Sequence, residues 1–119
     1  MEAMKISVVR KSQPVELEMD AEGNVVKVFV KEMTGAQRDE YFNKTSQRSR
    51  VDQNTGEVVG IKDYKGLYST LLSFCVYDTE GKALPESKIQ DWPDGAQRAM
   101  FEIARKLNKL GDDEGDEKN

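Results

Sequence analysis

The chain has 119 residues, which is the length of one ordinary domain and too short for two independent hydrophobic cores. Hydrophobic residues make up 37% and charged residues 34%, a more polar balance than in a typical globular protein but one that still supports a small core. Five of the 22 acidic residues and one of the 18 basic residues follow Gly111, so residues 1–111 carry 17 of each sign and have no basic surplus that would favour nucleic acid.

Cys75 is the single cysteine of the chain, so an internal disulfide is excluded and a reducing compartment is expected. The residues after Met1 lack the basic stretch and the apolar run of an export signal. The longest apolar run, residues 71–76, is interrupted by Ser73 and falls far short of the roughly 20 residues that cross a bilayer. We therefore expect a cytoplasmic protein without a transmembrane segment.

Strand patterns dominate the first third of the chain. The apolar residues that alternate with polar neighbours there are Ile6, Val8, Val15, Leu17 and Met19. Pro14 separates them into two runs, and residues 20–24 form a polar turn before a third run at residues 25–30. One face of this third run would carry Val26, Val28 and Val30. The pattern predicts a meander of three short antiparallel strands.

A helix is predicted to begin after Thr34, because Thr34 suits the N-cap and Gln37 lies where a capping-box side chain reaches back. Few residues of this helix are apolar, so it is expected to fray toward its end. Residues 45–60 are predicted to form a loop. The turn chemistry between Val51 and Val58 allows a small hairpin within that loop.

The strongest helical pattern lies in residues 61–76, where apolar residues recur at steps of three and four. These residues are Ile61, Tyr64, Leu67, Tyr68, Leu71, Leu72, Cys75 and Val76. A turn at residues 78–81 is predicted to end this central helix. Pro85 then suits the first turn of a short helix that runs through Ile89.

A last helix is predicted to begin with Asp94 as its N-cap and to stop at Gly111. Together the elements predict an α+β fold, in which a small N-terminal antiparallel sheet of three short strands is followed by a C-terminal group of three to four helices. Residues 1–110 would form a single domain, and residues 111–119 would form a disordered acidic tail.

The chain carries few groups suited to catalysis. It contains no histidine, the commonest general base and metal ligand near neutral pH. It has neither the CxxC or HExxH spacing of zinc sites nor a phosphate-binding glycine loop. Cys75 lies on the apolar face of the predicted central helix, where a thiol is more often a core residue than a nucleophile. We therefore expect no enzymatic activity, no cofactor and no metal.

The last predicted helix provides the candidate partner-binding surface. Its apolar stripe either packs on the central helix or forms a seam for another chain, and the two uses are compatible. Trp92, just before this helix, is either a core residue or an exposed anchor for a partner. The candidate partner-binding residues are Trp92, Ala96, Met100, Phe101, Ile103, Ala104, Leu107 and Leu110.

Three segments carry a resemblance to a known family: residues 34–41 after the last predicted strand, residues 64–82, and the terminal helix that runs to Leu110. In this order they resemble the tail assembly chaperones of long-tailed (siphovirus-type) bacteriophages or prophages, which begin with short strands and finish with helices. The likeness covers most of residues 5–110, although the polar loop at residues 45–60 departs from it.

The resemblance implies a chaperone that binds the tape measure protein, keeps it soluble in the host cytoplasm and promotes assembly of the tail tube around it. The partners it implies are the tape measure protein and the tail tube protein, with self-association left open and no nucleic acid or membrane involved. Such a protein would be absent from the mature virion. Two alternatives stay open, a structural head-completion or tail-terminator protein of the virion and a small nucleic-acid-binding regulator.

Overall fold

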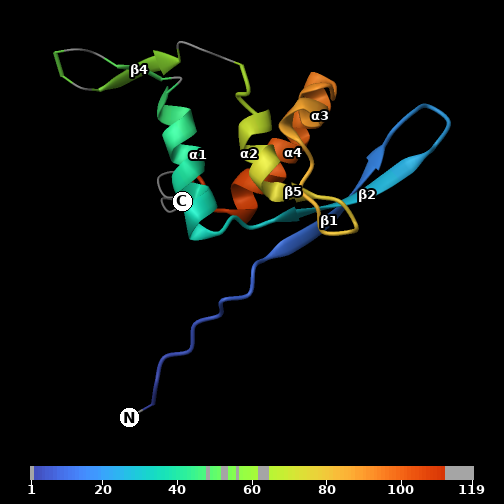
Figure 1. Cartoon of the computed structure of the whole chain (residues 1–119), viewed down its shortest axis with the longest axis horizontal. Coiled ribbons are helices and arrows are strands. Elements are labelled where there is room, and N and C mark those ends of the chain that lie inside the picture. Colours follow the sequence, from blue (N-terminus) through green and yellow to red (C-terminus); the bar gives the residue numbers. More distant parts are fainter. Residues whose placement is uncertain (1, 48, 52–53, 56, 62–64, 112–119) are drawn as a thin grey trace, which may run out of the picture.

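The fold is given by a computed structural model, which describes residues 2–47, 49–51, 54–55, 57–61 and 65–111 (Figure 1). Within these residues, a three-stranded antiparallel sheet and four helices form an α+β fold, which confirms the predicted fold class. The elements in chain order are β1 (Ser12–Glu18), β2 (Val25–Lys31), α1 (Gly35–Gln47), β3 (Ser49–Val51), β4 (Val58–Ile61), α2 (Ser69–Cys75), β5 (Val76–Tyr77), α3 (Glu86–Gln90) and α4 (Asp94–Leu107).

The third strand of the sheet is β5, and not the segment around Ile6 that the alternation predicted. β1 and β2 pair antiparallel along their whole lengths, and β5 joins the other side of β2 at Phe29 and Val30. Residues 2–11 contain no strand. Alternation identifies a segment that suits a strand. Which segment becomes the second neighbour of β2 depends instead on the path of the chain, which returns to the sheet after α2.

Pro14 lies inside β1, although the sequence pattern predicted that it would separate two strands. The backbone of Glu32 donates to Lys11 O at 2.8 Å, at one end of the β1–β2 ladder. At the other end, Met19 N donates to Asn24 O at 2.8 Å. The odd-numbered residues of β1 therefore bond to β2, and the even-numbered ones direct their backbone groups to the free edge, where a proline sacrifices no ladder hydrogen bond.

Helix α1 begins as predicted, with a complete capping box. Gln37 N donates to Thr34 Oγ1 at 3.2 Å, and Thr34 N donates to Gln37 Oε1 at 3.0 Å. The helix continues to Gln47, into the segment predicted as a loop. Strands β3 and β4 follow it and pair antiparallel, which confirms the predicted small hairpin.

The central helix is much shorter than predicted, because α2 spans Ser69–Cys75 rather than residues 61–76. Ile61 belongs to β4, and residues 65–68 form a turn, with residues 62–64 outside the described part of the chain. Gly66 has a φ of 76°, a left-handed conformation that does not continue a helix. Val76 already belongs to β5.

Helix α4 begins at Asp94, so Asp94 is the first helical residue and not the predicted N-cap. Pro93 takes the N-cap position, and no side chain caps the helix there. The carboxylate in the first turn still complements the helix dipole. The helix ends at Leu107, before Gly111, whose φ of 74° turns the chain away. The predicted tail lies outside the described residues apart from Gly111, and the single domain over residues 1–110 stays a prediction.

Asn108 follows α4 and ties the end of that helix to the rest of the fold. Its buried side chain accepts a hydrogen bond from Met33 N at 2.8 Å. The amide nitrogen donates to Ala104 O at 2.9 Å and to Cys75 Sγ at 3.5 Å. One amide therefore joins the segment after β2 to both α4 and α2, and a buried polar group with such partners is fully satisfied.

The hydrophobic core lies between one face of the sheet and the helices. Its buried apolar residues are Val28, Val30, Met33, Tyr41, Leu71, Leu72, Cys75, Val76, Ile89, Met100, Ala104 and Leu110. Figure 1 shows the loop of the β1–β2 hairpin projecting past the helices, while residues 2–9 lead away from the opposite end of the hairpin. Among the described residues, no helix is long and apolar enough to cross a bilayer.

Candidate partner-binding surface

The structure divides the eight predicted partner-binding residues between the core and its margin. Met100, Ala104 and Leu110 are buried, so they stabilise the fold and are not accessible to a partner in this conformation. The residues that are partly buried and pack against the core are Trp92, Phe101, Ile103 and Leu107, and Ala96 is also partly buried. The stripe of α4 thus packs internally, on α2, and partner binding by these residues stays a prediction.

Phe101, at the margin of the apolar stripe of α4, makes a contact within the molecule. Its ring packs edge-on against Tyr68, with 5.0 Å between ring centroids and an interplanar angle of 63°. This geometry is the one that aromatic pairs prefer. Phe101 therefore secures the turn before α2 to α4. Trp92 and Ala96 are the members of the predicted surface that line the hollows described next.

Trp92 borders a hollow of about 260 Å³ between the projecting half of the β1–β2 hairpin and the segment that connects β5 to α4. We call it the hairpin hollow. Its apolar lining residues are Leu17, Met19, Val26, Val28, Ala83, Leu84, Pro85 and Trp92. The chain builds it because the hairpin extends beyond the helices that cover the rest of its inner face (Figure 1).

A second hollow, of about 290 Å³, shares Leu17, Met19 and Trp92 with the first. Pro93 and Ala96 complete its apolar lining, and the acidic residues Glu18 and Asp91 also border it. Its hairpin residues come from the end of β1, which is an edge strand of the sheet, and none from β2, so we call it the edge hollow. Both hollows are smaller than the roughly 300–1,000 Å³ of small-molecule sites, which makes them suited to individual side chains of a protein partner.

The exposure of the hairpin residues was not foreseen from the sequence. Val26, Val28 and Val30 alternate on one face of β2, as predicted, yet Val26 is 46% exposed while the other two are almost completely buried. Met19, on the same face of the hairpin, is 52% exposed. The alternation identified the face correctly, but only the positions of the helices show where its cover ends.

Residues 2–9 form a second exposed apolar feature. The side chains of Met4, Ile6, Val8 and Val9 are between 74% and 93% exposed. Single exposed apolar residues are ordinary, but four within six positions are a feature of interaction segments. The alternation of this segment was recognised in the sequence as strand-like, and its lack of a strand partner was not.

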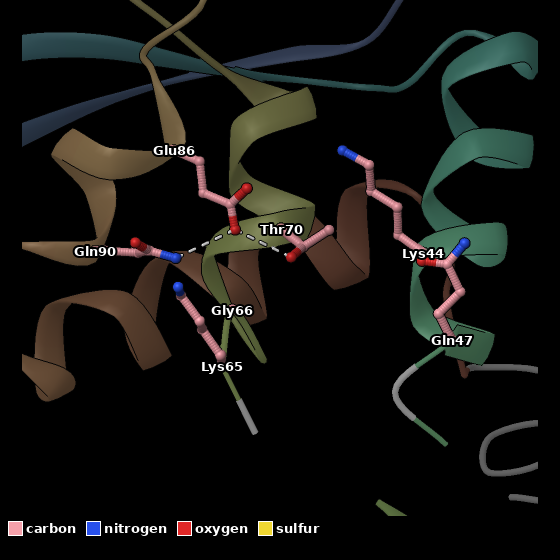
Figure 2. Close-up of a pocket in the computed structure, with 7 residues that line it drawn as sticks. All are labelled: Lys44, Gln47, Lys65, Gly66, Thr70, Glu86 and Gln90. Atoms are coloured by element: carbon pink, nitrogen blue, oxygen red, sulfur yellow. Dashed lines mark hydrogen bonds between the residues drawn. The ribbon is translucent and has the colours of Figure 1, made fainter. Parts of the chain in front are cut away.

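A larger, polar cavity of about 450 Å³ opens between α1, α2 and α3 (Figure 2). Its central carboxylate is Glu86, whose Oε2 accepts hydrogen bonds from Ser69 Oγ at 2.9 Å and Thr70 Oγ1 at 3.1 Å. Gln90 Nε2 also donates to it, at 3.4 Å. Glu86 therefore joins α3 to the first turn of α2, and its arrangement is explained by this structural role.

Two further kinds of group considered from the sequence are the thiol of Cys75 and side chains that could hold a metal ion. Cys75 is buried as expected, and burial raises the pKa of its thiol to about 12, so it is a poor nucleophile at neutral pH. Among the residues that the structure describes, no three His, Cys, Asp or Glu side chains lie close enough together to hold a metal ion.

The chain matches no known family model, no characterised protein and no solved structure. The resemblance to tail assembly chaperones consequently depends on the order of sequence features alone. The geometry adds two apolar hollows that meet at Trp92 and an exposed apolar segment at residues 2–9. These features are suited to binding another polypeptide.

Proposed function

We propose that the protein is a phage tail assembly chaperone, which binds the tape measure protein in the host cytoplasm and releases it as the tail tube assembles. The observation that supports a binding role most directly is the hairpin hollow, which is apolar, open and bordered by Trp92. A long helical client exposes apolar side chains before assembly, and a surface that accepts single side chains covers them reversibly.

The charges around the hairpin hollow favour reversible binding over permanent association. Asp78 and Lys88 both border it, so the apolar centre has a polar rim. A binding site of this size buries a few side chains of the client at a time. Exchange with the incoming tail tube protein then requires the loss of a small contact area only.

The test uses a pair of substitutions on β2. Val26→Glu places a carboxylate in the hairpin hollow, whereas Val25→Glu places one on the opposite face of the same strand, at a position that is 51% exposed. The tape measure protein is co-expressed with the wild-type chain or with either variant, and its soluble fraction is measured. We expect the wild type and Val25→Glu to keep it soluble, and Val26→Glu to lose most of this effect, through binding weakened about tenfold or more.

Two outcomes would contradict the proposal. A tape measure protein that is no more soluble with the wild-type chain than without it would overturn the chaperone function. Equal activity of Val25→Glu and Val26→Glu, with both variants folded by circular dichroism, would exclude the hairpin hollow as the site. Mass spectrometry of purified virions separates the structural alternative, because a chaperone is absent from them and a structural subunit is present in many copies.

A further inference from the structure

The segment that precedes β1 has the pattern of a strand, and within the described part of the chain it pairs with no strand. Met4, Ile6 and Val8 alternate with Lys5 and Ser7, and the three apolar side chains are 74% to 93% exposed. This alternation is the pattern of a strand with one buried face.

The segment is also distinct from β1 itself. Val8 and Val9 are consecutive apolar residues, so the alternation changes phase between them and the apolar positions become odd-numbered, as at Val15 and Leu17. A one-residue change of phase moves every side chain to the other face of a strand. Residues 4–8 therefore form a unit of their own, and not an extension of β1.

The contacts of Arg10 prevent this unit from folding back on β1 of its own chain. Arg10 Nε donates to Glu32 O at 2.7 Å, and its Nη2 donates to Gln37 Oε1 at 3.2 Å. The next residue continues the ladder, because Lys11 O accepts from the backbone of Glu32 at 2.8 Å. A chain reversal would have to occur at these fixed residues, and Figure 1 shows residues 2–9 leading away from the body instead.

The free edge of β1 has the complementary features. The backbone groups of Glu16 and Glu18 point away from β2, and Pro14 removes one donor from the other half of the edge. The half of the edge at residues 16–18 therefore keeps its donors, and it is also the half that borders the edge hollow. An unpaired strand edge of this kind is a template for another strand.

We propose that residues 4–8 of one copy of the chain add as a strand to the edge of β1 at residues 16–18 in a second copy. With Met4, Ile6 and Val8 directed to the inner face, the added strand covers the edge hollow beside Leu17 and Ala96. Lys5 then lies on the outer face with Glu16 and Glu18, where opposite charges on neighbouring strands attract. The reverse orientation would direct Lys5 toward the edge hollow and leave Met4, Ile6 and Val8 exposed on the outer face.

This self-association goes beyond the chaperone function and does not depend on it. The edge hollow and the hairpin hollow share Trp92, so strand addition also brings the two copies close to the surface proposed for the client. The backbone hydrogen bonds of strand addition supply affinity, and the alternate side chains supply specificity.

The test measures the mass of the full chain in solution by sedimentation velocity up to about 100 μM, a range that detects micromolar dissociation constants. We expect the wild type to associate, Ile6→Asp to be monomeric, and the control Ser7→Asn, which adds no charge beside Glu16 and Glu18, to associate like the wild type. Glu16→Pro should also be monomeric, because it removes a donor from the free edge and none from the β1–β2 ladder. All four proteins should give the same circular dichroism spectrum.

A charge exchange tests the orientation. Lys5→Glu should weaken association several-fold, and combining it with Glu16→Lys and Glu18→Lys should restore it. A wild-type chain that stays monomeric would overturn the proposal, as would association that survives both Ile6→Asp and Glu16→Pro. If only Glu16→Pro leaves association intact, the segment pairs with a different edge and the assignment to β1 is wrong.

Discussion

Both halves of the β1–β2 hairpin carry apolar side chains on the same face, but the helices cover that face in only one half. In the half near β5, Val28 and Val30 are 1% and 0% exposed beneath the helices. In the half near the turn, Val26 and Met19 are about half exposed, on the same face of the same sheet. A valine therefore stabilises the fold in one half and is available to a partner in the other, and the difference lies in where the helices end.

The largest expected effect comes from comparing Val28→Ala with Val26→Ala. Val28→Ala leaves a cavity in the core and should lower the free energy of unfolding by about 2 kcal/mol, whereas Val26→Ala should change it by less than about 0.5 kcal/mol. Urea unfolding followed by circular dichroism measures both. Equal losses would mean that the projecting half of the hairpin is covered in the folded protein, and the comparison would fail.

A second large effect is expected beneath the buried half, at Asn108. Asn108→Ala removes the acceptor of the Met33 N–H, which is left without its 2.8 Å hydrogen bond in a buried position. A buried unsatisfied group costs about 1–3 kcal/mol, so we expect a loss of about 2 kcal/mol in the free energy of unfolding. Asn24→Ala, in the exposed turn of the same hairpin, is the matched control and should cost much less.

The sequence was sufficient to predict the parts of the fold that depend on local chemistry. The capping box of Thr34 and Gln37, the turn at residues 78–81 and the inward face of Val26, Val28 and Val30 each follow from neighbouring residues. The helix start was predicted because both partners of the cap lie within one turn.

The errors concern features that distant contacts decide. Residues 61–76 have helical spacing, but Ile61 lies in β4 and pairs with β3, and Val76 lies in β5 and pairs with β2. Strand partners therefore override the local pattern at both ends. For the same reason, the sequence predicted only some residues of the candidate site. Trp92 was identified as a candidate anchor, while Met19 and Val26 were missed because their exposure depends on the end of the helical layer.

A third prediction concerns Cys75, in the core below the buried half. Burial raises the pKa of its thiol to about 12, so at pH 8 the reactive thiolate is about a thousandfold or more scarcer than for an ordinary cysteine. Alkylation with iodoacetamide should be correspondingly slow in the folded protein and fast in urea. Rapid modification without denaturant would show that the core opens readily, and that the two halves of the hairpin differ less than their burial indicates.

The smallest expected effect lies at the exposed turn of the hairpin, where the side chain of Asn24 donates to Asp20 Oδ2 at 2.7 Å. This hydrogen bond and those of nearby backbone N–H groups hold the pKa of Asp20 below its ordinary value of 3.8. Because the folded-state pKa is lowered, the contribution to stability is present above the ordinary pKa and is lost as the pH falls through the lowered one.

Asn24→Ala should therefore raise the pKa of Asp20 toward 3.8, measured by NMR titration of its carboxyl group. Asp78 is an internal control, because its pKa is lowered chiefly by the backbone of Lys82 in a separate turn and should not move. An unchanged pKa of Asp20 in Asn24→Ala would assign the shift to the backbone donors alone. A shift at Asp78 as well would show that the turn is coupled to the helical side of the molecule, contrary to the independence that its exposure predicts.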